Sequence, residues 1–451
     1  MFMIYNILLL LALPVVLFLH SLRAVRRRRP AALTQRFGFG IEPELSQRAG
    51  QGPIWVHAVS VGETMAVKPL LAALKQAYPE RLLILSNMTE TGRSVAHTIS
   101  AVDHCLYFPF DYPMVVHRML TRIRPSLVVI MESELWPNFL HTTRKMGIPT
   151  LICNGRISDR SFSRYLRLRC FFQPILEQVS TFCMQTAEDA RRIELIGAAP
   201  GRVRVCRNLK FDMPPVATDE NDQIADRATF RLPAGIPVVT AGSTHPGEEV
   251  TVLAAFQALL ASGQEGVLVL VPRHPERAVE VATLISQTGL AFQRRSRLDA
   301  AVCPLENGDV LLVDTVGELV RLYALSDLVF VGGSLVPAGG HNILEPAVMG
   351  VPMLFGPHMA NFREIAAKMI AAGGGIQLVD DADLVRKLPE LLRDKTLREE
   401  MGQRGRQLLL DNNGATELHL TAISELLPFK KGGACMTRDK AVHSGIKSEK
   451  N

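Results

Sequence analysis

The chain has few aromatic residues and only a moderate share of charged ones. Of its 451 residues, 6% are aromatic, 21% are charged and 47% are hydrophobic. This balance excludes a disordered or collagen-like chain, because such chains are too poor in hydrophobic residues to build a core. It also excludes a membrane protein with many spans, and it predicts a globular body of two or three domains.

Patterns typical of metal sites and disulfides are also missing. The cysteines form no CxxC pair and no HExxH motif is present, so the sequence predicts no structural metal. Most cysteines lie in hydrophobic runs, and we expect them to be reduced, buried thiols of a cytosolic body. The seven are Cys105, Cys153, Cys170, Cys183, Cys206, Cys303 and Cys435.

The net charge of +6 is unevenly distributed. Five arginines between residues 23 and 29 contribute +5 and the tail from Lys430 onward contributes +4, so subtracting both leaves −3 for the body. A nucleic-acid-binding surface requires a basic body. The charge distribution therefore argues against nucleic acid as a partner.

Residues 2–22 are almost wholly hydrophobic and are followed at once by the arginines. A cleaved signal peptide carries its positive charge before the hydrophobic run and a small-residue cleavage site after it, and this segment has neither. We therefore expect residues 1–30 to be an uncleaved membrane anchor with a basic flank, which places the body on the cytoplasmic side. A buried core helix is the alternative, and length does not decide whether an anchor crosses the bilayer or lies in one leaflet.

Short hydrophobic runs alternate with helical stretches along both halves of the chain. Hydrophobic strands separated by helices indicate a parallel sheet covered on both faces. The predicted fold class is α/β, with two doubly wound, Rossmann-like domains that face each other across a cleft. The runs are 54–59, 82–86, 105–110, 127–131 and 150–153 in the first half, and 238–242, 267–271, 309–314, 328–333 and 352–356 in the second.

Ligands of such sheets bind at the carboxyl ends of the strands, so the loops after these runs are candidate sites. The first loop, 57–63, ends in Gly62 and Glu63 directly before a predicted helix. Gly62 lets a ligand approach the backbone, and Glu63 is a candidate general base for an acceptor hydroxyl. The alternative is a glutamate that the helix dipole favours in the first turn, and position alone does not separate the two.

A second loop carries Glu132 and Glu134 directly after the run 127–131. If the strand continued, the period of two would point both carboxylates the same way, and their repulsion would raise one pKa. They are candidates for acceptor binding or for a second acid/base group. Equally, they are candidates for a structural ion pair with the basic loop 154–156.

Four strand-end loops of the second half combine small, basic and acidic residues, at 242–248, 271–275, 332–335 and 339–346. Backbone amides exposed at a helix start bind phosphate. Arg273 is placed to neutralise a leaving nucleotide, and Glu345 to accept hydrogen bonds from ribose hydroxyls. A glycine pair alone is a weak signal, but the four loops together predict a nucleotide-sugar-binding domain.

Several longer motifs resemble those of the 3-deoxy-D-manno-octulosonic acid (Kdo) transferases, glycosyltransferases of the GT-B fold in lipopolysaccharide assembly. With the N-terminal segment, they follow the family order from residue 1 to about 425. The tail 429–451 lies outside the resemblance and is expected to be a disordered basic extension. The motifs are HAVSVGET (57–64), MESELWPN (131–138), RNLKFD (207–212), STHPGEE (243–249), VPRHPER (271–277), DTVGEL (314–319), FVGGSL (330–335) and GGHNILEPA (339–347).

The resemblance implies that residues 31–212 bind the acceptor and residues 213–428 bind the donor, CMP-Kdo. Glu63 would be the general base that takes a proton from a hydroxyl of the lipid A precursor (lipid IVA) as its oxygen attacks Kdo with inversion. CMP would leave without a metal or further cofactor, and the implied location is the cytoplasmic side of the inner membrane. The implied CMP-binding residues are Pro272, Arg273, Val316, Gly317, Glu318, Asn342, Ile343, Leu344 and Glu345.

Two alternatives remain open on the sequence. One is another GT-B enzyme that uses a UDP-sugar, either a transferase or an epimerase. The other is an inert, membrane-anchored lipid-binding protein. The number of Kdo residues added is not decided by the sequence.

Overall fold

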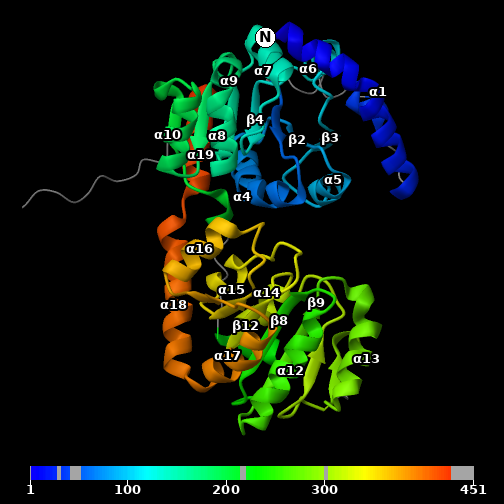
Figure 1. Ribbon diagram of the computed structural model, residues 1–451, viewed down its shortest axis with the longest axis vertical. Helices are drawn as coiled ribbons and strands as arrows, with labels where there is room; N and C mark the ends of the chain where they lie inside the picture. Colours follow the sequence, from blue (N-terminus) through cyan, green and yellow to red (C-terminus); the bar gives the residue numbers. More distant parts are fainter. Residues whose placement is uncertain (1, 28–31, 41–51, 214–219, 299–302, 428–451) are drawn as a thin grey trace, which may run out of the picture.

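The computed structural model describes residues 2–27, 32–40, 52–213, 220–298 and 303–427. These residues form two α/β domains that lie one above the other in Figure 1, each built on a parallel sheet of seven strands. The predicted α/β class with two Rossmann-like domains is therefore confirmed. The tail 429–451 lies outside the described residues.

The N-terminal sheet has the strand order β3-β2-β1-β4-β5-β6-β7. The chain starts at the central β1, moves to one edge and then returns to build the other side, so the order reverses between β1 and β4. All side chains of β1, β2, β4, β5 and β6 are buried, as expected for a sheet covered on both faces. The strands are β1 Ile54–His57, β2 Leu83–Asn87, β3 His104–Tyr107, β4 Leu127–Met131, β5 Thr150–Gly155, β6 Thr181–Met184 and β7 Val203–Val205.

Helices pack on both faces of this sheet, and several begin at a side chain that caps them. Ser60, Thr89, Ser158 and Thr186 each accept a hydrogen bond from a backbone N–H of the first turn, which replaces a partner missing at the helix start. The helices are α2 Leu33–Arg36, α4 Val61–Ala77, α5 Glu90–Ala96, α6 Pro113–Ile123, α7 Pro137–Lys145, α8 Asp159–Arg167, α9 Arg169–Leu176 and α10 Ala187–Ile196, with the 3₁₀ turns η1 Pro200–Arg202 and η2 Leu209–Phe211.

The C-terminal sheet repeats this design with the order β10-β11-β9-β8-β12-β13-β14, which reverses between β8 and β12. Its strands are β8 Val238–Thr244, β9 Val267–Pro272, β10 Phe292–Arg294, β11 Val310–Leu312, β12 Leu328–Val331, β13 Met353–Phe355 and β14 Gly375–Gln377. Its helices are α11 Glu220–Thr229, α12 Glu248–Ala261, α13 Ala278–Thr288, α14 Leu319–Ala324, α15 Leu344–Val348, α16 Arg363–Ala371, α17 Asp381–Arg393 and α18 Lys395–Asn412, with η3 Pro275–Arg277 and η4 Arg295–Arg297.

The last helix, α19 (Ala415–Leu426), crosses back and packs on the N-terminal domain. Ala422 and Ile423 are buried in the same hydrophobic cluster as the strands of the N-terminal sheet. Tyr78 also donates a hydrogen bond to the backbone oxygen of Leu427 at 2.7 Å. The expected single C-terminal unit 213–428 is therefore incorrect for α19, because its hydrophobic face is buried against the other domain.

The N-terminal helix α1 (Phe2–Arg27) lies along the N-terminal domain (Figure 1). Tyr5 donates a hydrogen bond to Asp111 at 2.9 Å, and Asn138 donates one to the side chain of Asn6 at 2.6 Å. Its other faces expose large hydrophobic side chains, among them Leu11 and Phe18. Among the described residues, no helix combines the length and the hydrophobicity needed to cross a membrane.

Candidate active site

Glu63 lies in the first turn of α4, where it binds back to the residues that begin the helix. The hydroxyl of Ser60, the N-cap residue, donates to Glu63 Oε1 at 3.0 Å, and the N–H of Val59 donates to Oε2 at 2.8 Å. This is a close variant of the capping box, whose S-x-x-E spacing is present in the sequence. The structural role considered for Glu63 is therefore present, and it consists of specific hydrogen bonds in addition to the helix dipole.

The surroundings of Glu63 also suit a general base. Burial raises the pKa of Glu63 to about 7. The hydrogen bond from Val59 lowers this pKa, and the negative charge of Glu132 raises it. A base transfers protons best when its pKa is close to the working pH. Each carboxylate oxygen has two lone pairs, so the two helix contacts leave room for a proton. Capping and proton transfer are thus compatible at one residue.

Glu132 and Glu134 do not continue strand β4, which ends at Met131. Glu132 has a φ of +54°, so the chain turns there and the period-two expectation is wrong. Glu132 forms an ion pair with Arg156 at 3.3 Å, which is the structural role considered for it. The pKa of Glu134 is raised by burial and by the charge of Glu132. The negative charges of both carboxylates raise the pKa of Glu63, so the loop after β4 and the loop after β1 lie close together.

Lys210 belongs to the same cluster, although its position in the sequence predicts no role for it. It lies in η2, on the segment that leads into the C-terminal domain, and burial lowers its pKa while Glu132 raises it. Its ammonium lies 5.2 Å from the ring centre of Phe362, at the start of α16 in the other domain. The signal for it in the sequence is the motif RNLKFD (207–212), which contains it.

The predicted donor residues lie at the strand ends of the C-terminal domain. Arg273 follows β9 and is exposed, and its charge acts on Glu345, whose pKa is raised mainly by burial. Asn342 donates a hydrogen bond to Glu345 at 3.1 Å. The side chains of Ile343 and Leu344 are fully buried in the core, so only their backbone atoms can reach a ligand.

The loop 316–318 also contains both exposed residues and a residue whose side chain is engaged within the protein. Val316 is 85% exposed, and Gly317 has a φ of +92°, a conformation that favours glycine. Glu318 forms an ion pair with Arg295 at 2.8 Å and accepts a hydrogen bond from Thr315. A ligand at this loop therefore meets the backbone of Val316 and Gly317 more readily than the carboxylate of Glu318.

The backbone amides of the glycine-rich loop 332–335 donate hydrogen bonds to a buried carboxylate. Glu248, which is 1% exposed, accepts hydrogen bonds from the N–H groups of Gly333 at 2.7 Å, Ser334 at 2.9 Å and Leu335 at 2.9 Å. The N–H of His245 donates to the same carboxylate at 2.8 Å. These three loop amides are therefore engaged inside the protein and are not free to bind a phosphate.

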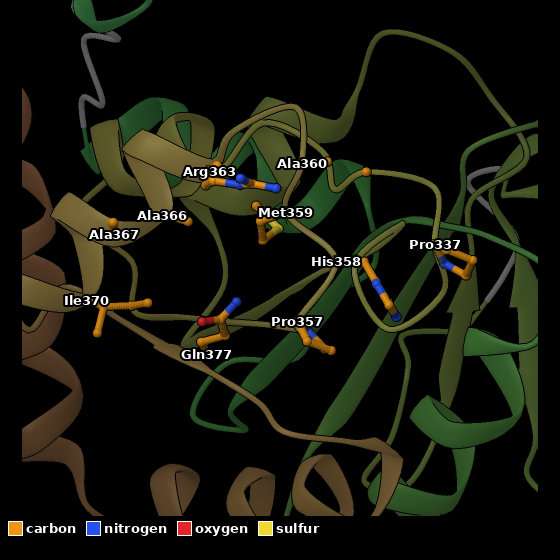
Figure 2. A pocket seen from close by; sticks show the side chains of 11 residues that line it. Pro337, Pro357, His358, Met359, Ala360, Arg363, Ala366, Ala367, Ile370 and Gln377 are labelled. Atoms are coloured by element: carbon orange, nitrogen blue, oxygen red, sulfur yellow. The ribbon is translucent and has the colours of Figure 1, made fainter. Parts of the chain in front are cut away.

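A cavity of about 380 Å³ lies beside the loop 339–346 and contains none of the predicted site residues. In Figure 2, His358 and Pro337 stand on one side and Ile370 on the other, with Arg363 and Met359 above. We place the chemistry at the strand-end clusters, because they bring together charged groups with altered pKa values. The lining residues are Pro337, Gly339, Pro357, His358, Met359, Ala360, Arg363, Ala366, Ala367, Ile370 and Gln377.

The two parallel α/β domains resemble in fold those of the GT-B glycosyltransferases. The solved structure of a glycosyltransferase from Rickettsia africae ESF-5 has this fold, with a TM-score of 0.54 at 13% identity over 84% of this chain and 100% of its own. That likeness concerns the fold alone.

Sequence comparisons identify the family. The family model of the 3-deoxy-D-manno-octulosonic-acid transferases (kdotransferases) matches residues 31–213. The 3-deoxy-D-manno-octulosonic acid transferase of Haemophilus influenzae is 36% identical over 94% of this chain and 98% of its own length, and that of Bordetella pertussis is 34% identical over 83% and 87%. The chain belongs to the Kdo transferase family and is a glycosyltransferase, as the motifs predicted.

Proposed function

We propose that this enzyme transfers Kdo from CMP-Kdo to a sugar hydroxyl of the lipid A precursor, lipid IVA, with inversion at the anomeric carbon of Kdo. Glu63 takes the proton of the attacking hydroxyl, and CMP leaves toward Arg273. The carboxylates of Glu132 and Glu134 keep Glu63 basic, and Lys210 offers a positive charge to the acidic sugar. The reaction needs no metal or further cofactor.

The observation that carries this proposal is the half-buried carboxylate of Glu63 in the first turn of α4, directly after β1, where burial raises its pKa. A carboxyl group with a pKa of about 7 is half ionised at neutral pH, so it accepts a proton from the hydroxyl and later releases it to water. The donor assignment is supported by Arg273 and Glu345, which lie close enough for their charges to interact at the strand ends of the other domain. Pro272, Asn342 and the backbone of the loops 316–318 and 342–345 complete the proposed CMP site.

The test is incubation of the purified chain with CMP-Kdo, generated in situ, and a tetra-acylated lipid A precursor. Mass analysis should detect addition of one or more Kdo residues, and CMP should be released in equal amount. Parallel reactions with UDP-sugars distinguish the proposed activity from that of a GT-B enzyme that uses a UDP-sugar. Release of UDP and no release of CMP would exclude CMP-Kdo as the donor. Absence of turnover with every donor would favour the inert lipid-binding alternative.

We further propose that α1 attaches the enzyme to the cytoplasmic leaflet of the inner membrane. The support is the row of exposed hydrophobic side chains, such as Leu11 and Phe18, together with the arginines at 23–29 that follow. Deletion of residues 1–29 should leave CMP binding intact but slow transfer to acceptor in vesicles. Equal rates on vesicles would show that the segment is not needed for attachment.

A further inference from the structure

Three histidines from three separate strand-end loops meet in the C-terminal domain. Nε2 of His245, after β8, lies 2.8 Å from Nε2 of His341, in the loop before α15. The two ring planes are nearly parallel, at 17°, with centroids 5.1 Å apart, and the ring of His274, after β9, lies 6.2 Å from His245 edge-on. Gly333 makes room for the pair, because a Cβ there would stand 2.9 Å from His341 and 3.3 Å from His245.

The contact between His245 and His341 limits the pair to at most one positive charge in the free protein, because the ring that accepts must be neutral. Two ring nitrogens at 2.8 Å form one hydrogen bond, so one of them donates and the other accepts. Burial lowers the pKa of His341 to about 4, and the charge of Arg273 adds to the effect. Burial likewise lowers the pKa of His245. The pair is therefore neutral at pH 7 before a ligand binds.

The charges that face the pair come from its own loops and from two neighbouring elements. Arg273 and His274 oppose protonation, while Glu248 and Glu249 favour protonation of His245. Both carboxylates are engaged elsewhere. Glu248 accepts hydrogen bonds from four backbone N–H groups, and Glu249 forms a partly buried ion pair with Arg277 at 2.7 Å. The groups that oppose protonation are therefore His274 and Arg273, and Arg273 is the residue that is proposed to meet the donor phosphate.

An anion beside Arg273 reverses this balance. It neutralises the cation that opposes protonation and adds negative charge that favours an imidazolium. We infer that the His245–His341 pair takes up one proton from solvent when the phosphate of the nucleotide binds, and that the charged pair then donates a hydrogen bond to the departing phosphate. This inference rests on the proposed function, because it assumes a nucleoside monophosphate next to Arg273.

The transfer of Kdo to the acceptor requires no net proton from the His245–His341 pair. The bond between the anomeric carbon and the phosphate oxygen breaks and its electron pair stays on that oxygen, while the acceptor oxygen forms the new bond and its proton passes to Glu63. The phosphate changes from a monoanionic diester to a dianionic monoester, so negative charge grows where the pair is positive. The pair returns its proton to solvent when CMP leaves.

Calorimetric titration of the full chain with CMP at pH 7.5, in three buffers that differ in ionisation enthalpy, measures the protons exchanged. At this pH a phosphate monoester, with its second pKa at about 6, is already mostly dianionic. We expect proton uptake with CMP and none with cytidine, which lacks the phosphate. His245→Asn and His341→Asn should abolish the uptake and weaken CMP binding about tenfold.

Cytidine binding serves as the folding check for both variants, and His245→Gln and His341→Gln provide a second pair. His274→Asn is the matched control and should retain the uptake. CMP binding without proton uptake, or with the same uptake in the variants, overturns the inference and leaves the proposed donor intact. Failure of the wild-type chain to bind CMP while it binds UDP overturns the proposed function itself, and the inference with it.

Discussion

The backbone N–H of Asn154 donates a hydrogen bond at 3.0 Å to Nε2 of His419, which is 265 residues later in the chain. Because an N–H can only donate, Nε2 must be unprotonated, and Nδ1 carries the hydrogen that is shared with the oxygen of Ala415 at 2.7 Å. Asn154 has a φ of +55°, and its side chain accepts from the N–H of Leu209, next to Lys210. Helix α19 thus supports the loops that carry the charged cluster.

Replacement of His419 tests this support. Both His419 and Asn154 are fully buried, so His419→Leu should leave an N–H without a partner and lower the free energy of unfolding by about 2 kcal/mol. Thr421→Ala, at an exposed position of the same helix, should change it by less than about 0.5 kcal/mol. Urea denaturation measures both values, and equal midpoints for His419→Leu and the wild type would refute the role of this contact.

The same contact predicts a pH dependence. The pKa of His419 is lowered by burial to about 4, below the ordinary value of 6.5. Between these values the unfolded chain binds the proton and the folded chain does not, so wild-type stability falls as the pH drops from 6.5 toward 4. The stability difference between the wild type and His419→Leu should therefore narrow over this interval. A constant difference would mean that His419 accepts the proton in the folded state.

Glu63→Gln separates catalysis from folding. Glutamine is accepted at this position of a capping box, so the free energy of unfolding should change by less than about 1 kcal/mol. Turnover should fall by at least about 100-fold, because the amide cannot take a proton. Glu80→Gln, at an exposed position after α4, is the control for loss of a surface charge. Unchanged turnover in Glu63→Gln would remove it as the base.

The pH dependence of kcat/KM should follow the ionisation of Glu63. The base must be deprotonated, so activity rises with pH through a midpoint near 7. The negative charge of Glu134 helps to raise this pKa, so Glu134→Gln should move the midpoint to lower pH. Initial rates with CMP-Kdo from pH 5 to 9 measure the shift. A midpoint that stays in place would show that the two carboxylates do not interact.

The fold could be predicted wherever burial leaves a clear pattern. Each of the ten hydrophobic runs corresponds to a strand, because strands buried on both faces need continuous hydrophobic residues. Four strands were missed. β7, β10 and β14 have only three residues each and several exposed or half-buried side chains, and β6 is a buried strand of only four residues, Thr181–Met184. The return of α19 was also missed, since Asp212 caps its start from about 200 residues away and no local pattern announces such a contact.

The candidate site could be predicted where its residues directly follow predicted strands. Glu63 and Arg273 stand directly after strands, where ligands of α/β sheets bind. Lys210 was missed because it follows no predicted strand, and its role depends on carboxylates that the fold brings to it. Glu248 was missed for a related reason: its sequence position resembles any first-turn glutamate, and the amides it accepts lie 85 to 87 residues further along the chain.

Glu248→Gln tests how the glycine-rich loop is held. The carboxylate accepts four N–H groups, whereas a glutamine side chain turns an NH₂ group toward some of them and leaves those donors unpaired. The free energy of unfolding should fall by about 2 to 3 kcal/mol. Hydrogen exchange at the amides of Gly333 and Ser334 should also become faster. Glu265→Gln, an exposed control in the same domain, should leave both unchanged, and unaltered exchange in Glu248→Gln would mean that the loop is held by other contacts.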